Sequence, residues 1–335
     1  MHYTLLDYYR FIAAFLVASS HYLLTYSYNL KFEFIAILGV ELFFPLSGFV
    51  LANQLQKLES NKKGFRIFFL RRWMRTIPPY LVALTCAAIV FDSGGFLNYL
   101  RFASYTQNIF IDNPSPNFYS VAWSLSVEEW FYLFIPLCLF ALLNLTKGIS
   151  NKLQTVCITT ILIGIILKFI FMPSPEFWGE EIRRSVIFRI DSICCGVLAF
   201  MWRKKLNQNI FIINLITISI IFIYLIYSPH SIAQNQFIQF LFLPTCSLSF
   251  AVTLAYLSKF KTSKNLSVIG RFLANISYSM YLFHILFIAL FQKFVTPNEL
   301  GFALYFLSLT GFSTVFYYFF EKPINDVRPQ YSPIN

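Results

Sequence analysis

The chain has 335 residues, of which 57% are hydrophobic and only 12% are charged. About a quarter of the residues in a soluble domain carry charge, so a soluble fold of this size would expose large apolar patches to water. The composition therefore excludes a soluble globular domain, and its apolar content also excludes intrinsic disorder. The six cysteines form no CxxC or Cys/His cluster, and neither a resident metal nor a nucleic-acid partner is expected.

Ten apolar stretches approach the length of about 20 residues that crosses a bilayer. They are 8–27, 34–52, 77–91, 120–143, 154–171, 187–202, 210–227, 237–258, 274–293 and 301–320. If the N-terminus lies inside, most of the 26 Lys and Arg residues fall on the inner connections, as the positive-inside rule requires. The sequence predicts an all-α, polytopic membrane bundle of about ten helices, with both termini cytoplasmic and one domain over residues 1–335.

The first span carries two ionisable residues, Arg10 and His21. Eleven residues are about three helical turns, so the two side chains share a face roughly 16 Å apart. Histidine is the side chain best suited to take a proton from a hydroxyl near neutral pH. A histidine hydrogen-bonded only for packing fits the sequence equally well.

The second span contains Pro45, Ser47 and Gly48, which allow a neighbouring helix or a ligand to approach closely. The fourth span opens with the adjacent carboxylates Glu128 and Glu129. Neighbouring residues of a helix point about 100° apart, so only one of the two is expected to face a shared cavity. We predict that this residue is Glu129.

The connection 53–76 holds seven basic residues and ends in Arg71-Arg72-Trp73-Met74-Arg75. If this stretch is helical, Arg72 and Arg75 lie on one face, where two guanidinium groups can bind phosphate oxygens. This pattern predicts a polyanion arriving from the cytoplasm. The spacing alone fits a lipid headgroup equally well.

Two later spans add further polar groups. Arg189 and Asp191 are two residues apart and cannot pair on one helix, so each needs a partner from another span. Ser277, Tyr281 and His284 form a stripe at i, i+4 and i+7 that can line a cavity. Unpaired ions are expensive in a membrane, and together these residues predict a polar central cavity above an anion-attracting inner mouth. An enzyme and a transporter fit this description equally.

The chain contains seven sequence blocks in the order that is typical of one protein family. They are Asp7-Tyr-Tyr-Arg10 followed by His21, Glu41-Leu-Phe-Phe-Pro-Leu-Ser-Gly-Phe49, Phe69-Leu-Arg-Arg-Trp-Met-Arg-Thr-Ile-Pro-Pro-Tyr80, Trp123-Ser-Leu-Ser-Val-Glu-Glu-Trp-Phe-Tyr132, Arg189-Ile-Asp191 with Gly196, Ser277-Tyr-Ser-Met-Tyr-Leu-Phe-His284, and Glu321-Lys-Pro323. The chain resembles the acyltransferase 3 family of multi-span bacterial acyltransferases, nearly from end to end. Glu41 and Pro45 depart from the family's usual Asp and Val and leave the shape of the second span open.

The resemblance implies a membrane O-acyltransferase of the bacterial inner (cytoplasmic) membrane. Such an enzyme moves an acyl group, most often acetyl, from cytoplasmic acyl-coenzyme A to a hydroxyl of a cell-surface glycan. The acyl-coenzyme A (acetyl-CoA) is a co-substrate, and no cofactor is expected to be bound permanently. The other partners implied are membrane lipids and the glycan acceptor.

The resemblance also suggests roles for individual residues. His21 deprotonates the acceptor hydroxyl or carries the acyl group, Arg10 orients the donor or stabilises its oxyanion, and Glu129 holds His21 or binds acceptor hydroxyls. The residues expected to bind the phosphates of coenzyme A are Arg71, Arg72 and Arg75. The remaining candidates for lining the cavity or binding substrate are Ser47, Glu128, Arg189, Asp191, Tyr281 and His284.

Some family members carry an additional extracytoplasmic domain, whereas this chain ends about fifteen residues after its last predicted span. We therefore expect a stand-alone form without an appended soluble domain. By analogy this size favours a lipid-linked or lipopolysaccharide O-polysaccharide (O-antigen) acceptor over peptidoglycan. The alternative from another class is a membrane transporter or polysaccharide flippase in which Arg10, His21 and Glu129 relay protons or bind a translocated anion.

Overall fold

The computed structural model describes residues 3–60, 64–110, 116–146, 151–296 and 298–330. Over these ranges the chain forms helices joined by turns and short loops, without a β-strand. In chain order the elements are α1 (Thr4–Tyr26), α2 (Leu30–Ser60), α3 (Gly64–Val90), α4 (Phe96–Ala103), α5 (Ala122–Leu145), α6 (Lys152–Ile170), η1 (Gly179–Arg183), η2 (Val186–Phe188), α7 (Ile190–Trp202), α8 (Gln208–Tyr227), α9 (Pro229–Gln234), α10 (Gln236–Leu257), α11 (Lys264–Phe294), α12 (Glu299–Phe316), η3 (Tyr317–Glu321) and α13 (Lys322–Asp326). The predicted all-α class is confirmed.

Eight helices of the described chain are long and apolar enough to cross a membrane. They are α2, α3, α5, α6, α8, α10, α11 and the continuous stretch from α12 through α13. The chain is therefore a multi-pass membrane protein. Helix α1 has 23 residues but is less apolar, and α7 has only 13, so a total of ten crossings stays a prediction. The cytoplasmic position of both termini also stays a prediction.

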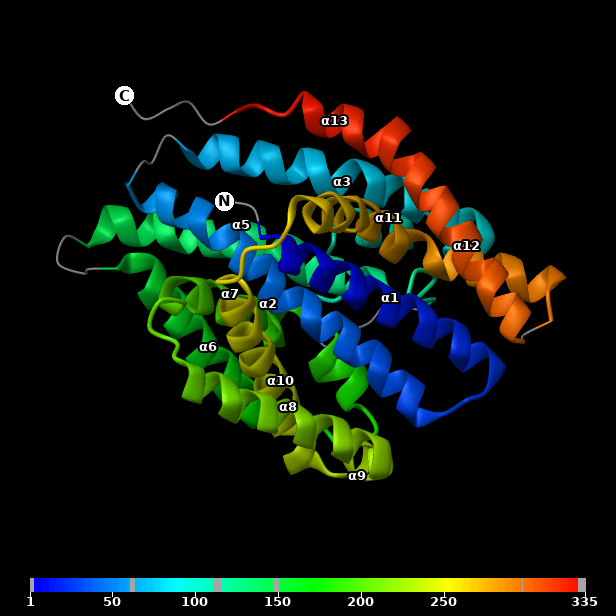
Figure 1. Cartoon of the computed structure of the whole chain (residues 1–335), viewed down its shortest axis with the longest axis horizontal. Coiled ribbons are helices and arrows are strands. Elements are labelled where there is room, and N and C mark those ends of the chain that lie inside the picture. Colours follow the sequence, from blue (N-terminus) through cyan, green and yellow to red (C-terminus); the bar gives the residue numbers. More distant parts are fainter. Residues whose placement is uncertain (1–2, 61–63, 111–115, 147–150, 297, 331–335) are drawn as a thin grey trace.

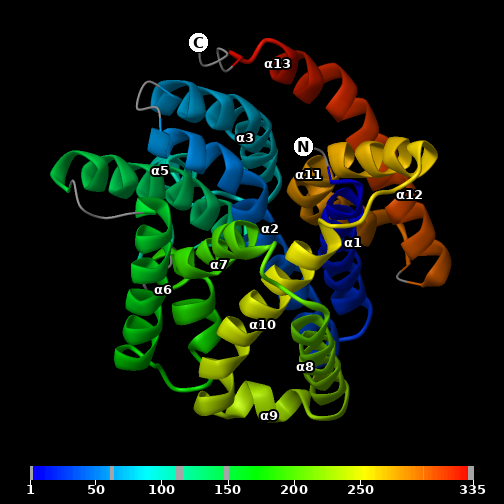
Figure 2. The same ribbon diagram turned by 60° about the vertical axis from the view of Figure 1, so that its left-hand side comes forward.

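Helices α1 and α2 run side by side through the middle of the molecule (Figure 1). Helix α2 packs against α7 on its other side, and α1 packs against α11. Figures 1 and 2 show α3, α11 and α12 on one side of this central pair, with α6, α8 and α10 on the other. The first three helices, α5 and α11 thereby converge, and their polar residues meet in the interior.

The basic segment 53–76 is helical for most of its length. Helix α2 continues to Ser60, and α3 begins at Gly64 and runs through the Pro78-Pro79 pair. The expected long inner connection is therefore reduced to residues 61–63, which lie outside the described chain. Because α3 carries Arg72 and Arg75 on the same helix as its apolar part, their positions relative to the bundle are fixed.

Helices α2 and α7 approach each other closely at two glycines. A Cβ atom added to Gly48 would lie 1.9 Å from the backbone oxygen of Ile193, and one added to Gly196 would lie 1.9 Å from that of Pro45. Each glycine thus faces the backbone of the opposite helix, which leaves no room for a side chain. The expectation that small residues near Pro45 admit a neighbouring helix is confirmed.

We expect Gly48→Ala and Gly196→Ala each to destabilise the protein by about 1–3 kcal/mol, because rigid backbone must shift to admit the methyl group. The measurement is thermal unfolding of the purified protein in detergent. Gly311→Ala on α12 is the matched control, since a Cβ at Gly311 meets no atom within 4 Å. Unchanged unfolding temperatures for both tight variants would contradict the close crossing.

Candidate active site

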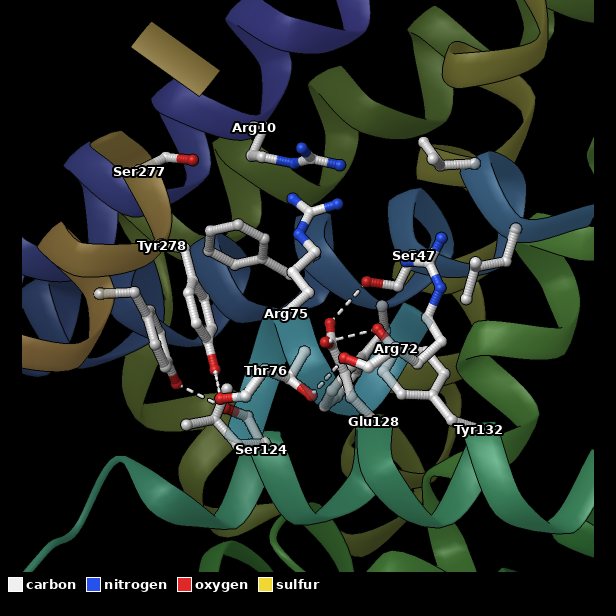
Figure 3. A pocket seen from close by; sticks show the side chains of 16 residues that line it. Arg10, Ser47, Arg72, Arg75, Thr76, Ser124, Glu128, Tyr132, Ser277 and Tyr278 are labelled. Atoms are coloured by element: carbon white, nitrogen blue, oxygen red, sulfur yellow. Dashed lines mark hydrogen bonds between the residues drawn. The ribbon is translucent and has the colours of Figure 1, made fainter. Parts of the chain in front are cut away.

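Side chains from five helices line an inner cavity with an empty volume of about 730 Å³. Its charged residues are Arg10 from α1, Arg72 and Arg75 from α3, and Glu128 from α5. Figure 3 shows the guanidinium groups of Arg10 and Arg75 facing each other across this space. The prediction that Arg72 and Arg75 share one helix face is confirmed. Three cations against one carboxylate make the cavity attractive to anions.

Glu128 is held at the cavity wall by two hydroxyl groups. The Oγ of Ser47 donates to one carboxylate oxygen at 2.5 Å, and the hydroxyl of Tyr132 donates to the other at 2.9 Å (Figure 3). The next residue, Glu129, is buried, 8% exposed, and does not line this cavity. The prediction that Glu129 is the cavity-facing carboxylate was wrong, because the rotation of α5 turns Glu128 inward and its neighbour about 100° away.

The arginines of the basic block differ in their surroundings. Arg72 donates to the side-chain oxygen of Gln54 at 3.2 Å. Arg10 and Arg75 make no hydrogen bond or ion pair with any described residue. Arg71 points away from the cavity and donates to the backbone oxygen of Pro329 at 2.5 Å, so it does not join the other candidates. Three guanidinium groups beside one carboxylate leave an excess of positive charge in a membrane interior. Such an excess is costly, and an incoming anion offsets that cost.

His21 and His284 form a stacked pair between α1 and α11. The Nδ1 of His21 lies 2.8 Å from the Nε2 of His284, and the two rings are nearly parallel. The Nδ1 of His284 lies 2.7 Å from the backbone oxygen of Tyr281. The Nδ1 partner of His21 is therefore His284, and not Glu129, for which holding His21 was one of the two expected roles. Both histidines stand out in the sequence as polar residues within apolar stretches, but the sequence does not indicate that they meet.

These distances fix the positions of the protons on both rings. A carbonyl oxygen only accepts hydrogen bonds, so the Nδ1 of neutral His284 carries the proton and its Nε2 accepts. The Nδ1 of His21 must then be the donor to that Nε2. The Nε2 of His21 is left with an unshared electron pair, which is the state required of a general base or a nucleophile.

His21 lines a second, outer cavity, with an empty volume of about 880 Å³. Its polar wall includes Glu33, Arg183 and Arg184. Tyr281 lines both cavities, and its hydroxyl lies 2.5 Å from the Oγ of Ser124. The single cavity expected from the sequence is thus two cavities that meet at Tyr281. Arg10 faces the inner one, and His21 faces the outer one.

Arg189 and Asp191 line neither cavity. Arg189 forms an ion pair with Glu41 of α2, and both side chains are fully buried. Asp191 forms an ion pair with Lys168 of α6, which is also buried. The prediction that each needs a partner from another span is confirmed, but their expected place in the cavity was wrong. Lys168, the single cation within its apolar stretch, was the sequence signal for the second pair.

The arrangement defines a class of protein: a membrane bundle with a cationic inner cavity and a histidine-bearing outer cavity. Comparison with known proteins identifies the family. A family model described as an acyltransferase domain matches residues 3–321. The chain therefore belongs to the acyltransferase 3 family. This membership favours an enzyme over the transporter or flippase alternative.

Two relatives illustrate the similarity. The chain is 28% identical over 200 residues to peptidoglycan O-acetyltransferase OatA of Listeria monocytogenes, covering 52% of this chain and 31% of that protein. It is 26% identical over 341 residues to O-acetyltransferase OatA of Staphylococcus aureus, covering 89% of this chain and 54% of that protein. The chain thus spans about half or less of the length of these two relatives. No solved structure matches it.

We expect Glu41→Gln to lower stability by about 3–5 kcal/mol, because it leaves the Arg189 charge buried without a counter-ion. Unfolding in denaturant measures this effect. Asp326→Asn serves as the control, because it breaks the exposed Lys322–Asp326 pair and should leave the transition unchanged. If Glu41→Gln unfolds like the wild type, the Glu41–Arg189 pair has no structural role.

Proposed function

We propose that this protein transfers an acetyl group from cytoplasmic acetyl-coenzyme A to a hydroxyl of a cell-surface glycan across the bacterial cytoplasmic membrane. The observation that carries the proposal is the meeting of two cavities at Tyr281, one lined by three guanidinium groups and the other by His21. A charged donor suits the first cavity, and an alcohol in need of deprotonation suits the second. The family membership supports the same chemistry.

The inner cavity is the proposed donor site. Coenzyme A carries a pyrophosphate and a 3′-phosphate, and guanidinium groups bind phosphate oxygens through paired hydrogen bonds. Arg72 and Arg75 hold these phosphates at the cytoplasmic side, while Arg10 orients the thioester or stabilises its developing oxyanion. The pantetheine arm is thin and uncharged at its end, so it can extend toward Tyr281 and the outer cavity.

The outer cavity is the proposed site of proton transfer. The Nε2 of His21 takes the proton of the acceptor hydroxyl as the oxygen attacks the thioester carbon. The carbon–sulfur bond breaks, and the coenzyme A thiolate leaves and recovers the proton from His21. In a relay route, the same Nε2 accepts the acetyl group first and passes it to the hydroxyl. Both routes need the unshared electron pair on Nε2 of His21, which is free because the hydrogen bond to His284 keeps the proton on Nδ1.

The proposed acceptor is a lipid-linked glycan or a lipopolysaccharide O-polysaccharide. The name of the Listeria relative specifies peptidoglycan, which makes peptidoglycan the acceptor to compare. Expression in hosts with chemically defined surface glycans distinguishes the two. The product is a base-labile mass increase of one acetyl group per repeat unit. Acetylation of peptidoglycan alone would overturn the O-polysaccharide proposal, and acetylation of neither would overturn the proposed function.

We expect His21→Ala to reduce acetyl transfer by at least about 10²–10⁴-fold, the usual contribution of a general base. His284→Ala should lower kcat less, since the base remains but its proton position is no longer fixed, and the KM for acetyl-coenzyme A should not change. Steady-state kinetics in detergent measures both. His230→Ala, at an exposed histidine of α9, is the control. Wild-type activity of His21→Ala would exclude this chemistry.

We expect Arg75→Ala to raise the KM for acetyl-coenzyme A about 10–100-fold, because hydrogen bonds to a charged phosphate are lost. The effect should vanish with acetyl-pantetheine, which lacks the nucleotide phosphates. Arg75→Lys should restore binding only in part, since an ammonium group cannot form the paired hydrogen bonds.

Arg66→Ala is the matched control, because Arg66 lies on the same helix and is exposed. An equal rise in KM for both donors in Arg75→Ala would show that Arg75 does not contact the phosphates. An unchanged KM for acetyl-coenzyme A would remove Arg75 from the donor site.

A further inference from the structure

A buried cation lies beside the outer cavity, at the opposite end of the site from the arginines of α3. Arg183 ends η1, its side chain is 6% exposed, and it lines the outer cavity together with His21. The guanidinium carbon lies 5.4 Å from the centre of the Trp123 ring, within the range of a cation–π contact. Its Nε has no hydrogen-bond partner, and the side chain forms no ion pair within the described chain.

Neighbouring charges do not neutralise Arg183. Burial and, to a smaller extent, the charge of Arg184 lower the pKa of its guanidinium group to about 9, although Glu33 and Glu180 act in the opposite direction. Glu180 is engaged in an ion pair with Arg184. A buried cation without a direct partner costs stability, and groups of this kind concentrate at functional sites.

The backbone around Arg183 is fixed from outside its own segment. The amide of Asn108 donates to the backbone oxygens of Arg184 at 2.5 Å and of Trp123 at 3.0 Å. The backbone N–H of Val186 donates to the backbone oxygen of Asn108 at 2.8 Å. These bonds tie η1 and η2 to the start of α5, so Arg183 is held in place before any ligand arrives. Such pre-organisation lowers the cost of binding.

We propose that Arg183 binds a carboxylate or phosphate group of the acceptor, so that the hydroxyl presented to His21 belongs to an anionic glycan. This inference rests on the proposed function, because it assigns the outer cavity to the acceptor. A neutral sugar leaves the guanidinium group without a counter-charge, whereas an acidic sugar supplies one. Carboxylate and phosphate both match the guanidinium geometry. The inference therefore specifies a negative charge on the acceptor glycan, and experiment decides whether a carboxylate or a phosphate carries it.

The test measures acceptor binding without any donor. The purified full chain in lipid nanodiscs is titrated with a disaccharide that carries one uronic acid, with the same disaccharide reduced to the alcohol, and with a hexose phosphate. We expect both acidic probes to bind the wild type at least about tenfold more tightly than the alcohol, a difference of about 1.4 kcal/mol. Tighter binding of one acidic probe than the other identifies carboxylate or phosphate as the source.

The same binding measurement is repeated with two variants of the outer cavity and one control variant. Arg183→Gln should reduce the ratio of the affinities for the acidic probes and the alcohol to below about threefold. Arg101→Gln, at an exposed arginine of α4, should leave this ratio unchanged. Glu33→Gln removes a carboxylate from the wall of the same cavity and should strengthen binding of the acidic probes a few-fold. A gain in affinity cannot arise from misfolding.

Equal binding of the acidic and neutral probes by the wild type would overturn this inference. An acid preference that survives in Arg183→Gln would also overturn it. Acetyl transfer is measured in a separate reaction with acetyl-coenzyme A. If transfer to every acceptor is absent while Arg183-dependent acid binding persists, the proposed function fails and the anion site stands.

Discussion

The cost of placing charge in a low-dielectric interior organises this molecule. Two buried ion pairs, Glu41–Arg189 and Lys168–Asp191, join helices and face no cavity. Arg10, Arg75 and Arg183 form no ion pair within the described chain and line cavities instead. The same physical cost therefore separates charges that hold the fold together from charges that are available to a ligand.

This separation explains why α1 and α2 lie at the centre. Helix α2 meets α7 with glycine against backbone on one face, and its Ser47 reaches Glu128 on another. Helix α1 presents Arg10 to the inner cavity and His21 to the outer one, three turns apart. Rigid packing of the central pair thus sets the spacing between the two halves of the site.

Much of this could be predicted from the sequence, because it depends on spacing within single helices. The shared face of Arg72 and Arg75, and the separation of Arg10 from His21, follow from helical periodicity alone. Periodicity does not give the rotation of a helix about its axis, which is why Glu128 rather than Glu129 faces the cavity. It also does not show which residues from distant segments meet, as His21 and His284 do across 263 positions.

The division into two cavities matches the chemical asymmetry between the proposed substrates. Coenzyme A carries several negative charges and crosses a membrane only at high cost, whereas an acetyl group is small and neutral. If the arginines of the inner cavity retain the phosphates, only the end of the pantetheine arm has to pass Tyr281. Tyr281 lines both cavities and shares a hydrogen bond with Ser124, and two hydroxyl groups can exchange partners without exposing a charge. Under the proposed function, acyl transfer would then need movement of a few side chains at one point, and not transport of either whole substrate.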